Sequence, residues 1–532
     1  MTRKRKAAAA LPHPDVDAAL AAMGAEELRE VARTMLLELD DRAYGRVTTA
    51  LVARAARGGS GWVPAAPSAA AVAEVAAFAA AAKCAGYADP SDVDERLRRG
   101  TAAFLRTDYA AARWMFGALL PPIAAAEIDL GQHELIDEVL AVDASECAVQ
   151  YVVAVYITSD PARRGEAVRA AIDEVRGIGN FFEPIRAMED AALAPLPDLD
   201  AFLGQWCAIV AQEAAGERRG GWDAEADRWL REVVERMEGS DGLGRIARET
   251  KRAEDLRAWC RSVVEAGDWQ RALSAFTEAA EVVSAKAGAR GEFLDGAALA
   301  AQQLAAEDLS PWLERAWREA PSFARLRRWL GAARDAATLR ERAVAALGAC
   351  PQWAHRQRAV LHVLQGDLEA AAKLLVAAPG LGWSGDEHPG RVLFPLFQKL
   401  LGTNGTSSPD LTLPDGALEV EERAIFDVER DEPHLATPDL AAVFRHAGVE
   451  PVAAAKLRKV VLAAMRQAAE KRIAGVTEEK RRRHYGHAAS LVAACVAADR
   501  SQESARWAAT IRAEYRRFPA LRAELDRGVS VR

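Results

Sequence analysis

The sequence has almost no run of β-branched residues long enough to form a strand, and aromatic residues make up only 6% of its 532 residues. Half of the residues are hydrophobic, and these are mostly Ala, Leu and Val. Ala and Leu, together with the many Arg and Glu residues, are strong helix formers. The composition therefore predicts an all-α fold.

Paired cysteines are also missing, because the six cysteines lie far apart and form no CxxC or CxC motif. In a chain of this length, such spacing is typical of reduced, mostly buried thiols in a cytoplasmic protein.

The longest apolar run, 69–82, is built from Ala and contains Glu74, so it predicts a core helix and not a membrane span. The apolar run after the basic start MTRKRK is too short for a signal peptide. We therefore expect a soluble, cytoplasmic protein that does not contact a membrane.

Motifs for common catalytic sites are absent: there is no GxxxxGK[ST], no GxSxG and no Cys with a motif-placed His. The GxGxxG match at 380–385 follows a predicted helix and opens no βαβ unit, so it predicts a loop that ends the helix. His133-Glu134 resembles the opening of a zincin helix, but Asp137 stands where the second histidine is required. The sequence therefore predicts no catalytic residue and no cofactor, although an enzyme with an unrecognised site remains an alternative.

A metal site is one interpretation of His484-Tyr-Gly-His487, because its two imidazoles lie about one helical turn apart, with Cys495 two turns further on. Metal binding would need further ligands and the groups that orient them. The competing interpretation is a solvated helix start beside a basic run. We adopt this second interpretation and predict no metal.

The net charge of -8 argues against a protein that coats nucleic acid over its whole surface, but it allows a local basic patch. The C-terminal region contains a basic set, namely Lys456, Arg458, Lys459, Arg466, Lys471, Arg472, Lys480, Arg481, Arg482 and Arg483. Its residues Lys471, Arg472, Lys480, Arg481, Arg482 and Arg483 are the candidate patch for nucleic-acid phosphates or an acidic partner. Alternatively, these residues form a solvated face balanced by the acidic stretch 419–432. Tyr485 is the only interleaved aromatic residue, too few for a stacking platform.

Two short helices joined by the turn Gly267-Asp268 are predicted for residues 255–283. Large residues fall at helical spacing in this range, namely Leu256, Trp259, Val263, Trp269, Leu273 and Phe276, and they are interleaved with Cys260, Ala272 and Ala279. Such a hairpin cannot bury its apolar face alone, so it must stack on similar neighbours.

The same spacing recurs at 92–120 and 353–378, where Asp108 and Asp367 take the place of Asp268 in the turn. Prolines 321, 351 and 379 close successive helices at spacings of 30 and 28 residues. A helix-turn-helix repeat has a period of roughly 34 residues. The sequence therefore predicts a series of helical hairpins that forms a solenoid.

Changes in composition divide the chain into predicted regions. They are a disordered basic tail (1–15), N-terminal helices (16–90), degenerate hairpins (91–250), a solenoid (251–401), an acidic linker (402–437) and a separate helical C-terminal domain with the basic patch (438–532).

A small residue, then Gly-Asp-aromatic, then Ala, Phe and Ala at these spacings resembles the tetratricopeptide repeat. The resemblance is closest at 253–283 and weaker in the first helices of the other two copies, where Arg96 and His355 occupy slots that the family fills with apolar residues. The two ends of the chain more faintly resemble the helical region of bacterial SWIM-type zinc-finger proteins. The CxC and CxH ligands of that finger are absent, so zinc binding is not implied.

In a tetratricopeptide-like hairpin, the first helix lines a concave groove. The resemblance implies that the groove residues are Arg257, Arg261, Val264, Glu265, Trp353, Arg356, Val360 and Leu364. Because Arg binds carboxylates in a bidentate manner, such a groove suits an acidic peptide or helix. The alternative is that neighbouring hairpins cover these residues. We therefore predict a non-catalytic scaffold for a protein partner, with a nucleic-acid-associated module as the alternative.

Overall fold

The computed structural model describes residues 14–59, 61–132, 135–217, 223–284, 288–385, 387–402 and 433–530. In these ranges every regular element is a helix, and the one β-type pairing is an isolated parallel bridge between Tyr87 and Asp129. The all-α prediction is therefore confirmed. Within the same ranges, no helix is long and apolar enough to span a bilayer. Most of the predicted tail (1–15) and most of the acidic linker (402–437) lie outside the described residues.

The chain forms two compact units, residues 1–242 and residues 243–532. The described helices of the first unit are α1 (Pro14–Ala22), α2 (Ala25–Leu37), α3 (Asp41–Arg57), α4 (Ala69–Ala85), α5 (Pro90–Leu105), α6 (Tyr109–Ala124), η1 (Ile136–Glu138), α7 (Ala144–Thr158), η2 (Pro161–Arg163), α8 (Arg164–Glu174), α9 (Pro184–Ala191), α10 (Leu199–Glu217) and the first part of α11 (Glu225–Thr250). Buried rings of Tyr156, Phe202, Trp206 and Trp229 follow one another through its core, with successive centroids 4.9, 5.8 and 5.6 Å apart. Near the boundary between the units, α11 is broken at Gly239, whose φ is 62°.

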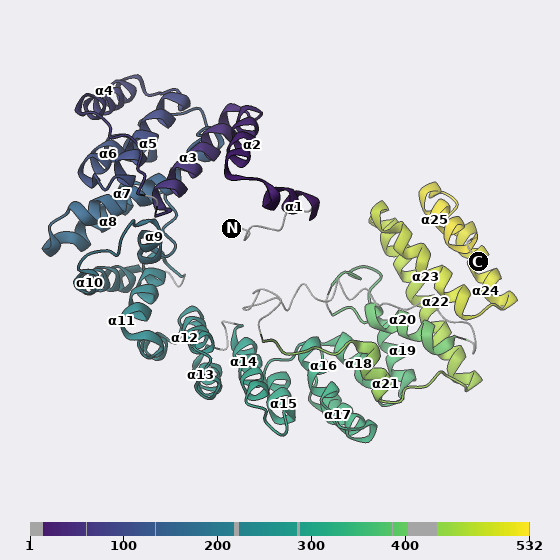
Figure 1. The fold of residues 1–532 in the computed structure, drawn as a ribbon. Helices are drawn as coiled ribbons and strands as arrows, with labels where there is room; N and C mark the ends of the chain where they lie inside the picture. Colours follow the sequence, from purple (N-terminus) through teal and green to yellow (C-terminus); the bar gives the residue numbers. More distant parts are fainter. Residues whose placement is uncertain are drawn as a thin grey trace. The chain divides into compact units, whose positions relative to one another are not determined.

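The second unit begins with a series of helices, each of which packs on the next (Figure 1). These are α12 (Ala253–Glu265), α13 (Trp269–Val282), α14 (Arg290–Gln303), α15 (Ser310–Glu319), α16 (Phe323–Gly331), α17 (Ala336–Ala349), α18 (His355–Leu364) and α19 (Leu368–Ala377). The remaining described helices are α20 (Gly390–Leu401), α21 (Leu440–His446), α22 (Ala455–Glu478), η6 (Arg482–His484), α23 (Tyr485–Ala498), α24 (Gln502–Glu514) and α25 (Pro519–Ser530).

The three hairpins predicted from the sequence have the same turn. In each, the residue before the turn aspartate (Asp108, Asp268 or Asp367) has a positive φ: 63° at Thr107, 72° at Gly267 and 77° at Gly366. The aspartate that follows caps the second helix, and its carboxylate accepts a backbone N–H three residues later at 3.0 or 3.1 Å. An aspartate in this position satisfies an amide that the helix leaves without a partner. The Asp residue is therefore a folding signal of each hairpin.

A fourth turn with this geometry joins α22 to η6 and α23, where the sequence shows no Gly-Asp pair. Lys480 has a φ of 52°, and Arg481 has φ −84° and ψ 66°, close to the −84° and 70° of Asp367. The Arg481 N–H donates to the carbonyl of Val476 at 2.8 Å, as the Asp367 N–H donates to that of His362 at 2.9 Å. The same backbone turn therefore forms here without its usual residues and presents cationic side chains.

One hydrophobic core crosses the predicted linker. It joins apolar residues of α18 to α20, such as Leu361 and Phe397, to residues of α22 and α23, such as Val461, Ile473 and Val492. Helix α22 packs on α19, α20 and α23. The range 438–532, predicted as a domain of its own, therefore shares its core with the preceding helices.

Candidate functional site

The predicted groove residues of α12 remain at or near the surface. Arg257 forms ion pairs with Glu254 and with Glu292 of α14, at 3.0 and 2.8 Å. Arg261 and Glu265 are exposed and Val264 is half-buried. These residues are accessible to a partner, but Arg257 already has carboxylate partners within the chain.

The predicted groove residues of α18 are not accessible, so this part of the prediction is wrong. Arg356, Val360 and Leu364 are buried, and the Arg356 guanidinium lies 3.9 Å from the centre of the Phe323 ring. The reason is that α16, α17, α19 and α20 all pack on α18 and enclose it. Trp353, in the turn before α18, is exposed.

Two members of the predicted basic patch support the fold. The Lys471 ammonium donates to the carbonyls of Val376 and Ala378, at 2.5 and 3.5 Å, at the C-terminal end of α19. Arg472 is buried and donates to the carbonyl of Gly380 at 3.3 Å. Cations in this position satisfy carbonyls that a helix end leaves without partners. Neither is available to a nucleic acid, whereas Lys480, Arg481, Arg482 and Arg483 are exposed.

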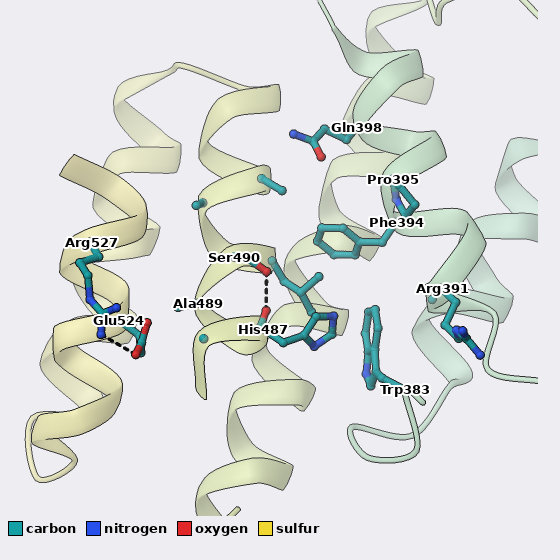
Figure 2. A pocket seen from close by; sticks show the side chains of 15 residues that line it. Trp383, Arg391, Phe394, Pro395, Gln398, His487, Ala489, Ser490, Glu524 and Arg527 are labelled. Atoms are coloured by element: carbon teal, nitrogen blue, oxygen red, sulfur yellow. Dashed lines mark hydrogen bonds and ion pairs between the residues drawn. The ribbon is translucent and has the colours of Figure 1, made fainter. Parts of the chain in front are cut away.

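A groove of about 760 Å³ lies between α20, α23 and α25 of the second unit (Figure 2). One wall is a face of α20, and the opposite wall carries Glu524 and Arg527 of α25. Between them lies the surface of α23. The lining residues are Trp383, Gly390, Arg391, Phe394, Pro395, Gln398, Gly486, His487, Ala489, Ser490, Leu491, Ala493, Ala494, Glu524 and Arg527. None of the eight predicted groove residues lines it.

Trp383 closes one end of the groove and is surrounded by other rings. Its centroid is 4.6 Å from that of His388, 5.2 Å from that of His487 and 6.0 Å from that of Phe394. Figure 2 shows the rings of Trp383, His487 and Phe394 side by side at this end. A glycine at position 390 permits the packing, because a Cβ there would lie 2.7 Å from the Trp383 ring.

The loop that carries Trp383 is pressed against α22. A Cβ at Gly380 would lie 2.0 Å from the backbone oxygen of Lys471, so only glycine allows this approach. The sequence predicted that these glycines end a helix. The helix instead ends at Ala377, and Gly380 serves the contact with α22.

The two histidines beside Trp383 are neutral at neutral pH. His388 accepts the Gly390 N–H on Nδ1 at 3.1 Å, so its Nε2 carries the proton and donates to the carbonyl of Pro379 at 3.0 Å. Burial, opposed by this last bond, lowers the pKa of His388. Burial and the nearby Arg472, His484 and His388 lower the pKa of His487 to about 4. Of the two, His487 lines the groove, and it does so without a charge.

Some polar groups of the groove are engaged with one another. The Ser490 hydroxyl donates to the backbone carbonyl of His487 at 2.7 Å, not to its imidazole, and Glu524 accepts from Arg527 at 2.6 Å. Figure 2 marks both contacts. A nucleophile with an adjacent base would need a hydroxyl bonded to the imidazole. The arrangement suits binding of a ligand better than nucleophilic catalysis.

The possible metal ligands of α23 do not converge. Cys495 lies in the core, where burial raises the pKa of its thiol to about 12, whereas His487 faces Trp383. In the described ranges no group of three or more His, Cys, Asp or Glu side chains is placed to hold a metal ion. His133 and Glu134 lie outside those ranges.

Sequence reasoning missed the walls of this groove. Trp383, Phe394 and Gln398 were not singled out, because only the tertiary packing of α20 beside α23 brings them together. One signal was available: Gly486, Ala489, Ser490, Ala493 and Ala494 place small side chains along one face of α23. No protein-family model, curated protein or solved structure matches this chain, so its function has to be inferred from the groove itself.

Proposed function

We propose that this chain is a non-catalytic cytoplasmic adaptor that binds a segment of a partner protein in the groove between α20, α23 and α25. The observation that carries the proposal is the groove itself, which combines apolar walls with a few charged residues at its edges. An apolar groove between helices is a common binding site for an amphipathic helix.

Two further observations support the proposal. The recurring hairpin turn at Thr107, Gly267, Gly366 and Lys480 is typical of helical repeats, which present extended binding surfaces. A fold alone supports no particular activity. The neutral imidazole of His487 and the engaged hydroxyl of Ser490 add support for binding without chemistry.

A nucleic-acid-associated module is the second candidate, and the four successive exposed cations Lys480 to Arg483 favour it. Binding to phosphates would weaken steeply as salt is raised. A chain that binds neither DNA nor RNA at about 50 mM salt, where such contacts are strongest, would exclude this function.

The adaptor function is tested by filling the groove. A displayed library of random 16-residue peptides is selected on the full chain, and the affinity of the recovered peptides is measured by fluorescence anisotropy. We expect Ala493→Trp to weaken their binding at least about tenfold, because the indole occupies space that the ligand needs. Ala345→Trp places the same side chain on an exposed position of α17 and is the control. If the library yields no peptide, or if Ala493→Trp binds as tightly as the control, the proposed function is wrong.

A further inference from the structure

Among the described residues, the cations at one end of the groove have no carboxylate partners. We call the exposed residues Lys480, Arg481, Arg482 and Arg483 the cationic cluster. No member forms an ion pair with any described residue. Other arginines of the unit do form such pairs, for example Arg325 with Asp295 at 2.8 Å. In a chain of net charge -8, this concentration of unpaired positive charge predicts an acidic ligand.

The cationic cluster adjoins the end of the groove marked by Trp383. Two residues separate Arg483 from Gly486 and His487, which line the groove. The buried Arg472 is close enough to lower the pKa of His487. The positive charge is therefore concentrated where the groove begins, and not along its length.

Two helix N-termini reinforce this field. Helix α20 begins at Gly390 and α23 at Tyr485, and both starts lie close to Trp383, which would contact a Cβ at Gly390 and whose ring lies 5.2 Å from that of His487. The N-terminus of a helix carries a partial positive charge. Arg391, the second residue of α20, lines this end as well. The opposite wall carries Glu524, but Arg527 neutralises it.

The shape of the groove fits a helix. Gly486, Ala489, Ser490, Ala493 and Ala494 are spaced i, i+3, i+4, i+7 and i+8, and their small side chains allow another backbone to approach closely. Their span rises about 12 Å along α23, and a cylinder of that length with the roughly 10 Å diameter of a helix has a volume of about 900 Å³. The groove of about 760 Å³ therefore holds much of two helical turns.

We propose that the occupant is an amphipathic α-helix of a partner protein, with small or apolar residues against α23 and carboxylates at the end that meets the cationic cluster. This inference rests on the proposed adaptor function and specifies the chemistry of the partner. A nucleic acid fits less well, because most residues that line the groove beyond Trp383 are apolar or small, such as Phe394, Pro395 and Ala493.

The test uses the peptides selected on the full chain. We expect them to be enriched in Glu and Asp at one end, followed by apolar residues at i, i+3, i+4 and i+7. Changing the four exposed cations Lys480, Arg481, Arg482 and Arg483 to Gln should weaken their binding about tenfold, because four exposed charge contacts are removed. The remaining binding should depend less on salt. Arg472 is left in place because it is buried and supports the loop.

The outcomes separate the two proposals. Peptides that lose affinity with Ala493→Trp but carry no acidic residues, or that bind the Gln variant unchanged, would overturn the acidic-helix inference and leave the adaptor function in place. If no selected peptide loses affinity with Ala493→Trp, the adaptor function is wrong as well. A 20-nucleotide RNA or DNA is tested in the same way. If it binds more tightly than the peptides and the Gln variant does not bind it, the acidic-helix inference is overturned in favour of nucleic acid.

Discussion

At the scale of single residues, Lys480 is notable for the conformation of its backbone. It is held in the left-handed backbone region, which costs a residue with a Cβ about 1 kcal/mol or more. The equivalent residues Gly267 and Gly366 avoid this cost. Thr107, at the same position in the first hairpin, bears a similar cost without a charge.

Replacing Lys480 separates backbone strain from charge. We expect Lys480→Gly to raise the free energy of unfolding by about 1 kcal/mol, because glycine relieves the left-handed strain. Lys480→Ala removes the same charge but keeps the Cβ, so it should leave the stability nearly unchanged. Urea unfolding of the full chain measures both variants. Equal midpoints for the two would show that Lys480 is not strained in solution.

At the scale of elements, the loop after α19 determines one end of the groove. Lys471 and Arg472 of α22 bind the carbonyls of Val376, Ala378 and Gly380 and so hold the loop on α22. This places Trp383 between the start of α20 and the start of α23. Lys471 and Arg472 were predicted to belong to a binding patch. They instead hold Trp383 in its position in the groove.

A methyl group at Gly380 should displace this loop. Its Cβ would meet the Lys471 backbone oxygen at 2.0 Å, so we expect Gly380→Ala to lower the free energy of unfolding by about 1–3 kcal/mol and to weaken peptide binding. Gly348→Ala is the matched control, since a Cβ there meets no atom within 4 Å and alanine is the better helix former in α17. The control should be as stable as the natural chain or slightly more stable. If the Gly380→Ala chain unfolds and binds the peptides like the natural chain, Gly380 does not contact the Lys471 backbone as described.

At the scale of the whole molecule, one hydrophobic core of the second unit extends from Ala298 to Leu525, beside a second one formed by residues such as Leu256 and Phe276. Helix α22 contributes to it Val461, Met465, Ile473 and Val476, all fully buried. Each such side chain contributes about 1.5–3 kcal/mol, whereas a typical domain has a total stability of about 5–15 kcal/mol. Removing α22 and α23 together should therefore cost more free energy than the rest of the unit has in stability.

Truncation tests this expectation. A fragment of residues 243–401 should fail to unfold cooperatively and should be digested rapidly by protease, whereas a fragment of residues 243–532 should show one cooperative transition by circular dichroism. The natural full-length chain provides the reference signal. Cooperative unfolding of 243–401 alone would instead support the two domains that the sequence predicted.

Local features were predictable from the sequence because they depend on neighbouring residues. Helix-forming composition determined the all-α class, and the Asp residues at 108, 268 and 367 marked three turns because a short carboxylate caps the helix that follows it. The turn at Lys480 could not be recognised, since its backbone conformation is imposed by the packing of α22 on α23 and not by a glycine.

Accessibility was decided by the tertiary structure alone. Helical spacing placed Val360 and Leu364 on one face of α18, but it could not show that the neighbouring helices bury that face. Nor could it show that Arg472 points into the protein while Arg481 to Arg483 face solvent. The sequence determined which helices form, because propensity and capping act over a few residues. The structure decided where the groove lies, because its walls are residues more than 100 positions apart, brought together by burial of one shared core.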